Sequence, residues 1–361
     1  MARILIAPDS FKGSATSHQV CDALTHGWLE VRNGDAIETA PFADGGEGTL
    51  DCIESVSASA VRVPIHVQGA TGIEHRSSWL LVNGDTAVIE MAALCGITTV
   101  EKLDPLGAHS FGVGQAINAA LNDDRVREIL VAVGGSASTD GGTGALVALG
   151  FTFLDADGSA VGLGGAQLHA IETIVPPEHM ASVERGIKVL VDVQSPLVGI
   201  PGAAHVFAPQ KGADAGQLDF LDIGLSHLLS LVGVADKPGY GAAGGVSFGL
   251  SALLGATIVS GVHTIASLID LEEKIKQADC VITGEGSFDS QSFSGKVVGY
   301  IADVAQRNNV PMMIACGVNE NADSPSIISL VDLAPSVESA KSESGKWLIE
   351  AGKKLATTFH D

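Results

Sequence analysis

Basic residues are scarce in this sequence. It contains only 20 Lys and Arg against 42 Asp and Glu, which gives a formal net charge of −22 at pH 7. A protein with this charge repels nucleic acid and acidic membrane surfaces, so we exclude both as partners. An anionic ligand can bind only where a nearby lysine, backbone N–H groups or a metal ion reverses the field. The position of each lysine is therefore informative.

Signals for several other classes of protein are also absent. No apolar run approaches the roughly 18 residues of a membrane-spanning helix. The start, MARILIAPDS, fits a first strand better than a signal peptide, and we expect a cytoplasmic protein. The five cysteines form no C-x-x-C and no zinc-type Cys/His pair, so we expect reduced, mostly buried thiols. The eleven histidines form no metal motif, and no G-x-S-x-G turn surrounds a serine.

Short β-rich apolar runs alternate with helical patterns along the chain. Examples of such runs are residues 4–7, 128–133, 189–193 and 280–283. This alternation predicts an α/β fold with a largely parallel sheet. A chain of 361 residues also exceeds the size of a single core, so we expect two domains. In such folds ligands bind beyond the carboxyl ends of the strands.

The loop after the first strand carries Asp9, Ser10 and Lys12, and the next helix is expected to begin near Thr16 or Ser17. A lysine at the mouth of a sheet can hold a carboxylate or a phosphate as a point charge. The alternative is a solvated loop lysine.

A second loop, at residues 42–49, combines Asp44 and Glu47 with the glycines Gly45, Gly46 and Gly48. Glycines let a backbone approach another group closely. Two carboxylates suit a metal ion or a hydroxyl proton better than a bare phosphate. Asp44 could instead serve only as a helix N-cap.

The strongest loop signal lies at residues 134–144, between a strand and a helix. A glycine-rich turn that enters a helix N-terminus offers N–H donors and a positive dipole end, so it predicts an anion cradle. The loop has neither the Walker A pattern nor the spacing of G-x-G-x-x-G. A flexible loop is the alternative. The residues expected to contact phosphate here are Gly134, Gly135, Ser136, Ser138, Thr139, Gly141 and Gly142.

Three later features are interpreted in the same way. Asp192 ends a strand and is expected to be functional or capped. Lys211 lies among turn residues, and Gly244 and Gly245 belong to a second glycine loop. These two segments could form a cap and a hinge, or both could contact a nucleotide.

The strand at residues 280–283 is followed by a loop that repeats the pattern of glycines, two carboxylates and hydroxyls. The carboxylates are Glu285 and Asp289.

Nine motifs between residues 6 and 292 resemble, in this order, the motif set of the type I glycerate kinases. They are IAPDSFK at 6–12, ADGGEGT at 43–49, EMA at 90–92, DPL at 104–106, GGSASTDGGTG at 134–144, DVxxPLVG at 192–199, PQKGA at 209–213, GAAGG at 241–245 and ITGEGxxDxQS at 282–292.

The resemblance implies two α/β domains, one of them Rossmann-like with a mainly parallel sheet, with the active site in the cleft between them. The Rossmann-like domain would comprise residues 1–68 and 265–361, split around an inserted α/β domain at 69–264. The implied reaction is phosphorylation of D-glycerate by ATP with Mg²⁺, with 2-phosphoglycerate favoured over 3-phosphoglycerate. The oligomeric state is left open, with a homodimer as one alternative.

The family's motif residues are carried over position by position. They are Asp9, Ser10, Lys12, Asp44, Glu47, Ser136, Asp140, Asp192, Lys211, Glu285 and Asp289. In the hypothesis that follows, Lys12 steadies an anion, and the loop at 136–144 cradles phosphate with support from Asp9, Ser10, Gly45, Gly46, Lys211, Gly244 and Gly245. Glu285 and Asp289 reach Mg²⁺ directly or through water, and Asp192 or Asp44 orients the substrate hydroxyl.

The sequence departs from the family pattern at Thr139, Gln194, Ser195, Ser287 and Ser247. Ser287 replaces an arginine that could clamp an anion with two hydrogen bonds, which bears on substrate choice. A kinase of a related small hydroxy acid is therefore one alternative, and a non-catalytic protein that binds a nucleotide or an organic acid is another. A dehydrogenase is a weaker rival because the dinucleotide fingerprint is absent after the first strand.

Overall fold

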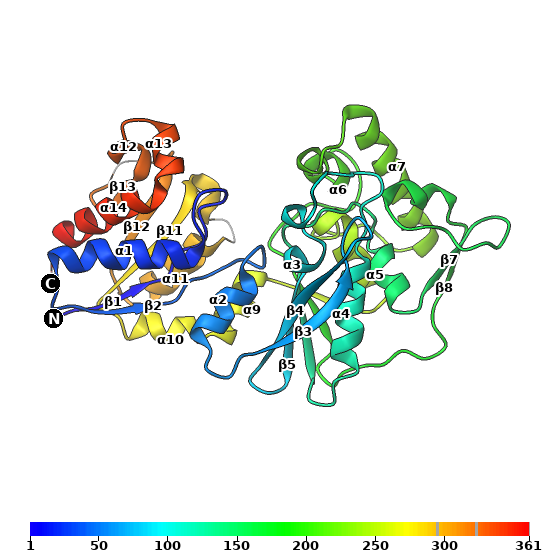
Figure 1. Cartoon of the computed structure of the whole chain (residues 1–361), viewed down its shortest axis with the longest axis horizontal. Helices are drawn as coiled ribbons and strands as arrows, with labels where there is room; N and C mark the ends of the chain where they lie inside the picture. Colours follow the sequence, from blue (N-terminus) through cyan, green and yellow to red (C-terminus); the bar gives the residue numbers. More distant parts are fainter. Residues whose placement is uncertain (294–295, 322–323, 361) are drawn as a thin grey trace. The chain divides into compact units, whose positions relative to one another are not determined.

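The computed structural model describes residues 1–293, 296–321 and 324–360. The chain forms two compact units (Figure 1). Unit 1 comprises Met1–Asp44, Asp51–Ala58 and Val262–Asp361, and unit 2 comprises Gly45–Leu50 and Ser59–Gly261. The expected boundary after residue 68 differs from this division, because strand β3 (Val61–Gln68) pairs with β4 (Glu74–Val82) inside unit 2.

Unit 1 is built on a five-stranded parallel sheet with the order β13-β12-β11-β1-β2. Counted along the chain within this unit, the order is 2-1-3-4-5, which is one of the two common doubly wound arrangements. The strands are β1 (Arg3–Ile6), β2 (Ala36–Thr39), β11 (Cys280–Phe288), β12 (Met312–Asn319) and β13 (Ile327–Ser329).

Alternate side chains of this sheet belong to different hydrophobic clusters. Ile4 and Ile6 pack in the cluster of α1 (Ser17–Val31) and α14 (Ser344–Thr358). Ile314 and Cys316 pack with Val298 of α11 (Val297–Arg307). Side chains alternate across a strand, so the helix after β1 and the helix after β11 cover opposite faces. The crevice between the carboxyl ends of β1 and β11 is therefore the topological switch point, where ligands bind in this kind of sheet.

Helix α1 begins where the sequence predicts, because Thr16 is its N-cap and forms a capping box with Gln19. It packs closely against α14, beside which it lies in Figure 1. A Cβ added at Gly27 would lie 2.0 Å from the carbonyl oxygen of Ile349. Glycine at this position thus permits the close approach of the two helices.

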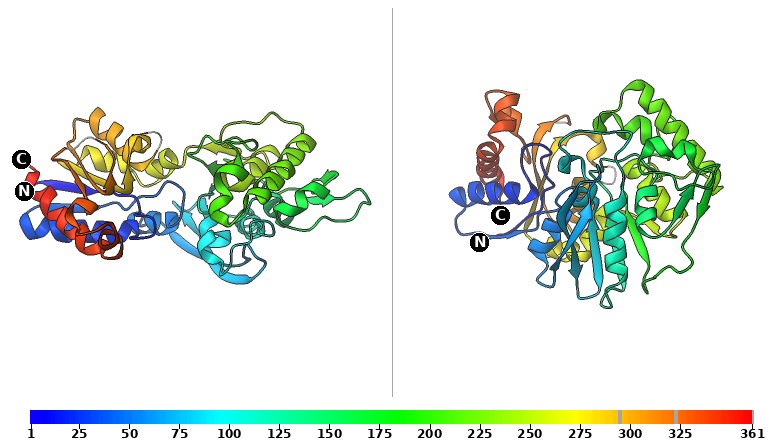
Figure 2. Two further views of the ribbon diagram at one scale, coloured as in Figure 1. Left: turned by 90° about the horizontal axis from the view of Figure 1, so that it is seen from above. Right: turned by 45° about the vertical axis from the view of Figure 1, so that its right-hand side comes forward.

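Unit 2 contains a mixed six-stranded sheet with the order β10-β9-β6-β5-β4-β3. Strands β5, β6, β9 and β10 pair in parallel, and β3, β4 and β5 pair antiparallel. A separate two-stranded sheet, β7–β8, lies apart from the large sheet (Figure 2). The bounds not yet given are β5 (Thr86–Glu90), β6 (Glu128–Ala132), β7 (Thr152–Leu154), β8 (Thr173–Val175), β9 (Ile187–Leu190) and β10 (Thr257–Val259).

Short helices surround both sheets, and the expected α/β fold with mainly parallel sheets is confirmed. Their bounds are α2 (Thr49–Val56), α3 (Met91–Cys95), α4 (Phe111–Leu121), α5 (Thr143–Ala148), α6 (Ala203–Phe207), α7 (Ala215–Val232), α8 (Val246–Ala252), α9 (Gly261–Leu268), α10 (Leu271–Lys276), α12 (Leu330–Leu333) and α13 (Val337–Ser342). Within the described ranges, no helix is both long and apolar enough to cross a membrane.

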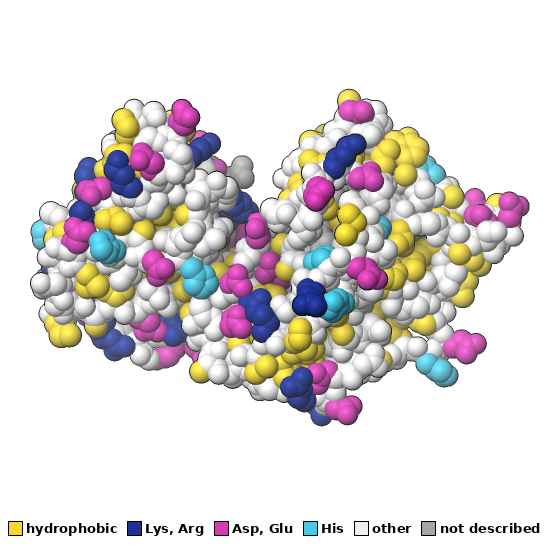
Figure 3. All heavy atoms as spheres, viewed as in Figure 1, with side chains coloured by type: hydrophobic (Ala, Val, Ile, Leu, Met, Phe, Trp, Pro, Cys, Tyr) yellow, Lys and Arg dark blue, Asp and Glu magenta, His cyan; other side chains and the backbone are white. Residues whose placement is uncertain are grey.

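Many of the basic side chains on the surface form ion pairs with carboxylates. Lys188 lies 2.5 Å from Glu128, and Arg185 lies 2.9 Å from Asp85. On the face shown in Figure 3, basic side chains lie close to acidic ones in several places. All five cysteines are buried, as the sequence predicts, and none of the five forms a disulfide bond.

Candidate active site

The switch point of unit 1 brings together two of the sequence motifs. The backbone N–H of Asp9, which follows β1, donates to the carbonyl of Gly284 in β11 at 2.9 Å. Glu285 is the next residue of β11. The motif after the first strand and the motif near residue 285 are therefore adjacent, as their position at the ends of neighbouring parallel strands predicts.

Asp9 lies in an unfavourable field for a carboxylate. Burial and the nearby Asp44 carboxylate raise its pKa from 3.8 to about 7, and Glu285 adds to this effect. The N–H of Ser10, which lies 2.6 Å from Oδ1 of Asp9, and the positive charge of Lys12 act in the opposite direction. Two carboxylates thus repel that of Asp9 in the presence of one lysine, an arrangement that a bound cation would stabilise.

Lys12 projects from a fixed turn. Phe11 is buried, and its N–H donates to the carbonyl of Ala15 at 2.8 Å. The side chain of Lys12 itself is exposed and makes no hydrogen bond or ion pair with any residue that the structure describes. This lysine is therefore available to an anionic ligand.

Glu285 lies inside a strand, whereas the sequence predicts that the strand ends at residue 283. Strand β11 continues to Phe288 because it stays paired with β12 as far as Asn319. Glu285 is 8% exposed, and its Oε1 has no hydrogen-bond partner in the described part of the chain. Burial raises the pKa of this carboxyl, and a hydrogen bond from Ser292 opposes the shift.

Ser292 connects Glu285 to Asp289. The N–H of Asp289 donates to Oγ of Ser292 at 2.9 Å, and the N–H of Ser292 donates to Oδ1 of Asp289 at 3.2 Å. Within residues 1–293, 296–321 and 324–360, no group of three His, Cys, Asp or Glu side chains is placed to hold a metal. Protein sites for Mg²⁺ commonly use only one or two carboxylates with water and substrate phosphates. The unpaired buried oxygen of Glu285 fits such a site.

The carboxylate of Asp192 already accepts hydrogen bonds from other residues of unit 2. Its Oδ1 accepts hydrogen bonds from Oγ of Ser260 at 2.7 Å and from the N–H of Gly261 at 3.1 Å. These contacts fit the structural alternative that the sequence left open for this residue.

Asp44 belongs to unit 1 and has no such support. It makes no hydrogen bond or ion pair within the described residues, and it is only partly buried. It does not act as an N-cap, since α2 begins at Thr49 and the N–H groups of Gly48 and Leu50 donate to Glu90 at 3.0 and 2.9 Å. Of the two acids proposed to orient a hydroxyl, Asp44 is the one left unpaired.

The glycine segment after Asp44 is fixed inside unit 2. The carbonyl of Gly45 accepts from the N–H of Gly134 at 3.0 Å, and the carbonyl of Gly46 accepts from Oγ1 of Thr49 at 2.7 Å. A Cβ added at Gly134 would lie 2.6 Å from the Cα of Gly46. The glycines of the second and third loops thus allow their backbones to pack against each other. The buried carboxylate of Glu90 also holds this segment, because it accepts from the N–H of Gly48. In the sequence, Glu90 stands out only as part of the EMA motif.

In the loop at 134–144, the helix N-terminus is already occupied by an internal carboxylate. Asp140 accepts from the N–H groups of Gly142 and Gly144, each at 3.2 Å, and from Oγ of Ser138 at 3.3 Å. It also accepts from the N–H and from Oγ of Ser110, each at 2.8 Å. The donors that the sequence assigns to a bound phosphate at this end of α5 are therefore used by Asp140. Ser110 was not predicted, although it directly precedes a helix.

The second glycine loop packs against the first. The N–H of Gly141 donates to the carbonyl of Gly244 at 2.9 Å. A Cβ at Gly244 would lie 2.2 Å from the carbonyl oxygen of Ser138, and one at Gly245 would lie 2.8 Å from the Cα of Gly141. Much of the glycine in both loops therefore serves backbone packing. Thr139 is buried beneath them, and its Oγ1 has no partner in the part of the chain that the structure describes.

Only Gly134 and Gly135 of this loop are not buried. Lys211 lies under the loop, 1% exposed, with its Nζ 2.8 Å from Oγ of Ser136 and also donating to the carbonyl of Ser138. Burial lowers the pKa of Lys211 to about 7, and the Asp140 carboxylate opposes this shift. Among the predicted phosphate residues of this loop, Gly135 is thus exposed, Gly134 is half-buried and the others are buried.

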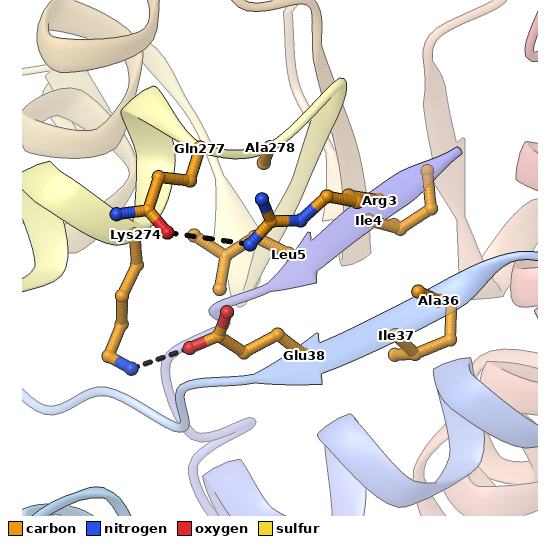
Figure 4. A pocket seen from close by; sticks show the side chains of 9 residues that line it. All are labelled: Arg3, Ile4, Leu5, Ala36, Ile37, Glu38, Lys274, Gln277 and Ala278. Atoms are coloured by element: carbon orange, nitrogen blue, oxygen red, sulfur yellow. Dashed lines mark hydrogen bonds and ion pairs between the residues drawn. The ribbon is translucent and has the colours of Figure 1, made fainter. Parts of the chain in front are cut away.

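A surface cavity of about 230 Å³ lies elsewhere in unit 1, beside β1, β2 and α10 (Figure 4). Lys274 points to Glu38 at 2.5 Å, and Arg3 donates to Gln277 at 3.4 Å. The two basic residues that line the cavity, Arg3 and Lys274, are therefore already engaged, and no predicted site residue lines the cavity.

The chain is similar to known proteins over nearly its whole length. Residues 4–360 match the model of the glycerate kinase family. Glycerate 2-kinase of Escherichia coli strain K12 is 40% identical over 328 residues, which cover 87% of this chain and 85% of that protein. Glycerate kinase of Bacillus subtilis strain 168 is 34% identical over 99% of this chain and 97% of that protein.

A solved structure agrees with these sequence relatives. The crystal structure of a protein assigned as glycerate kinase 2, from Salmonella typhimurium LT2, superposes with a TM-score of 0.80 at 32% identity. The match covers 99% of this chain and 98% of that chain. The motif resemblance is confirmed, and the chain belongs to the glycerate kinase family.

Proposed function

We propose that this kinase transfers the γ-phosphoryl group of ATP to D-glycerate in a Mg²⁺-assisted, in-line reaction and forms 2-phosphoglycerate in preference to 3-phosphoglycerate. The observation that carries the proposal is the match to the glycerate kinase family over residues 4–360. The E. coli relative bears the name glycerate 2-kinase, which supports the 2-position. ATP and Mg²⁺ follow from the chemistry of kinases, in which the protein mainly positions groups and stabilises charge.

In unit 1 we assign the cation and anion contacts. Glu285 and Asp289 would hold Mg²⁺, which when bound would neutralise charge on the transferred phosphoryl group. Support comes from the unpaired buried oxygen of Glu285 and from the mutual repulsion of the acids around Asp9. Lys12, exposed and unpaired within the described residues, would hold the substrate carboxylate or a phosphate.

In unit 2 we assign the backbone contacts to the phosphate groups. Gly134 and Gly135 are the only residues of the loop at 134–144 that are not buried. The N–H of Gly134 already donates to the carbonyl of Gly45, so the N–H of the exposed Gly135 would face the anion. The remaining predicted residues of the loop would act by fixing its shape, because their polar groups are buried and the Asp140 carboxylate takes the donors at the start of α5.

For the group that orients or deprotonates the substrate hydroxyl, we favour Asp44 over Asp192. A general base needs a free oxygen within reach of the proton. Asp44 has no hydrogen-bond partner within the described residues, whereas Oδ1 of Asp192 already accepts from Ser260 and Gly261.

A direct test is ³¹P NMR of a mixture of purified protein, ATP, Mg²⁺ and D-glycerate. We expect ADP and 2-phosphoglycerate to appear together, and neither to form after EDTA removes Mg²⁺. A 3-phosphoglycerate resonance would overturn the assigned position. ATP binding and glycerate binding without any turnover would overturn the catalytic proposal.

A related hydroxy acid is the second candidate substrate. Ser287, which replaces the arginine of the family pattern, is exposed at the end of β11. Loss of a bidentate anion clamp would weaken selection for the substrate carboxylate. Turnover of tartronate or glycolate with a kcat/KM above that of D-glycerate would make this candidate the correct one.

A further inference from the structure

We propose that Lys211 is a positioning residue for the phosphoryl transfer, and that it fixes the segment 136–138 from beneath and so orients the backbone of the adjacent, exposed Gly135. The inference rests on the proposed function, in which the backbone of Gly135 faces an anion of the substrate. It gives Lys211 a role different from the direct phosphate contact that the sequence motif suggests.

The side chain of Lys211 is enclosed by protein. The residue ends a short 3₁₀ helix (Pro209–Lys211) and is 1% exposed. A buried ammonium group is costly unless hydrogen bonds replace its water. Its Nζ donates to Oγ of Ser136 at 2.8 Å and to the carbonyl of Ser138. Both acceptors belong to the loop after β6, so the bonds tie two distant parts of the sequence together.

The charge of Lys211 is balanced inside the protein. Asp140 is the carboxylate whose field acts on it. Ser138 links the two residues, because its carbonyl accepts from Lys211 while its Oγ donates to Asp140 at 3.3 Å. One serine thus connects the lysine to the aspartate through two hydrogen bonds. This connection stabilises a defined loop geometry and leaves little charge for a ligand at the surface.

The same segment is held on its other side by the end of α3. The N–H of Ala137 donates to the carbonyl of Cys95 at 3.0 Å, and the N–H of Ile97 donates to the carbonyl of Gly135 at 2.9 Å. Gly135 is exposed and adopts φ +73°, a conformation that glycine tolerates best. Without the bonds from Lys211, the segment would lose two of the hydrogen bonds that restrain it. A displacement of about 1 Å of a positioning group can cost about 10²-fold in rate.

Lys12 provides the contrast within the same protein. It is exposed and unpaired within the described residues, as a lysine that meets a ligand should be. Lys211 would need to break both bonds to the loop before it could reach a substrate. We therefore expect the replacement of Lys12 and the replacement of Lys211 to change the enzyme kinetics in different ways.

The test is a double-mutant cycle in the glycerate kinase assay, with Lys211→Met, Ser136→Ala and both together. We expect Lys211→Met to lower kcat by about 10- to 100-fold with KM for ATP changed less than about threefold. The double variant should lose no more than about twofold beyond Lys211→Met, since both changes break the same bond. As a control, the rate losses caused by Lys12→Met and by Ser136→Ala should multiply when the two changes are combined. Independent, multiplying effects of Lys211→Met and Ser136→Ala would overturn the inference.

A second measurement uses the unaltered enzyme and decides the question if Lys211→Met fails to fold. An acyl-phosphate derivative of ATP acylates lysines that lie next to bound phosphates, and the labelled residue can be found by peptide mass spectrometry. We expect no ATP-protected label on Lys211. Such a label on Lys211 in an enzyme that turns over D-glycerate would overturn only this inference. Absence of turnover by the folded, unaltered enzyme would instead overturn the proposed function.

Discussion

Asp9 in unit 1 and Asp140 in unit 2 are acids in loops that follow strands, yet their surroundings differ. Asp140 accepts hydrogen bonds from two side-chain hydroxyls and three backbone N–H groups. Asp9 accepts one from the neighbouring Ser10 and faces the carboxylates of Asp44 and Glu285. A carboxylate whose oxygens are saturated by protein donors shapes the backbone around it. One surrounded by other acids remains available to a cation or a substrate.

The largest expected effect is the loss of the saturated carboxylate. Asp140→Ala should lower the free energy of unfolding by about 3 kcal/mol or more, because several buried donors would lose their acceptor at roughly 1–3 kcal/mol each. Urea unfolding followed by circular dichroism measures this. The exposed Asp157 provides a control, since Asp157→Ala should change stability by less than about 0.5 kcal/mol. If Asp140→Ala lowered the free energy of unfolding by less than about 1 kcal/mol, the difference drawn between Asp140 and Asp9 would be wrong.

The second expected effect is on catalysis, and it compares two further acids, Asp44 and Asp192. Asp44→Asn should lower kcat by roughly 10²- to 10⁴-fold, because an amide cannot accept the substrate proton. Asp192→Asn should lower kcat less than about tenfold, because its amide oxygen can still accept from Ser260 and Gly261. Steady-state assays at several Mg²⁺ concentrations separate either role from metal binding. A larger loss at Asp192 than at Asp44 would transfer the proposed role to Asp192.

The third effect is a gain in stability at the repelled acid. The folded-state pKa of Asp9 is raised from 3.8 to about 7, so the folded state holds a proton that the unfolded state releases between these pH values. The contribution of Asp9 to stability is therefore present at low pH and is lost as pH rises through 7. Asp9→Asn should raise the free energy of unfolding at pH 8 by roughly 2 kcal/mol, a value discounted for partial exposure. Unfolding at pH 4 and pH 8 measures it, and an equal effect at both pH values would contradict it.

The smallest effect is a pH dependence at Lys211. Burial lowers its pKa from 10.5 to about 7, so between these pH values the unfolded state binds more protons and stability rises with pH. From pH 7.5 to 8.5, the unaltered protein should gain about 1 kcal/mol relative to Lys211→Met. The titration of the cysteines is common to both proteins and cancels in this difference. Parallel stability curves for the two proteins would show that Lys211 keeps its proton throughout.

Local signals in the sequence predicted several elements correctly. Apolar runs indicated four strands of the two large sheets, β1, β6, β9 and β11, and Thr16 marked the start of α1. The strand containing Glu285 was predicted too short, because its extension to Phe288 depends on pairing with β12. Propensity describes a segment by itself, whereas the length of a strand also depends on its neighbour.

The candidate site was predictable in its residues and much less in their roles. Lys12 and Asp44 were identified from their loops, and the structure leaves both unpaired within the described residues. The loop at 134–144 was interpreted as a phosphate cradle because glycines before a helix usually indicate one. Nothing near that loop in the sequence shows that Asp140 fills the helix end, or that Gly244 packs against Gly141.

The sequence by itself therefore determined the α/β class, the family and the loops that carry polar residues, because periodicity, turn chemistry and motifs are local properties of the chain. Only the tertiary structure decided which of those polar groups are satisfied. Ser110 meets Asp140, Ser260 meets Asp192, and Lys211 meets Ser136 from 30, 68 and 75 residues away along the chain. A carboxylate or an ammonium group becomes structural or available to a ligand according to these distant partners, since burial without a partner is costly and burial with one is not.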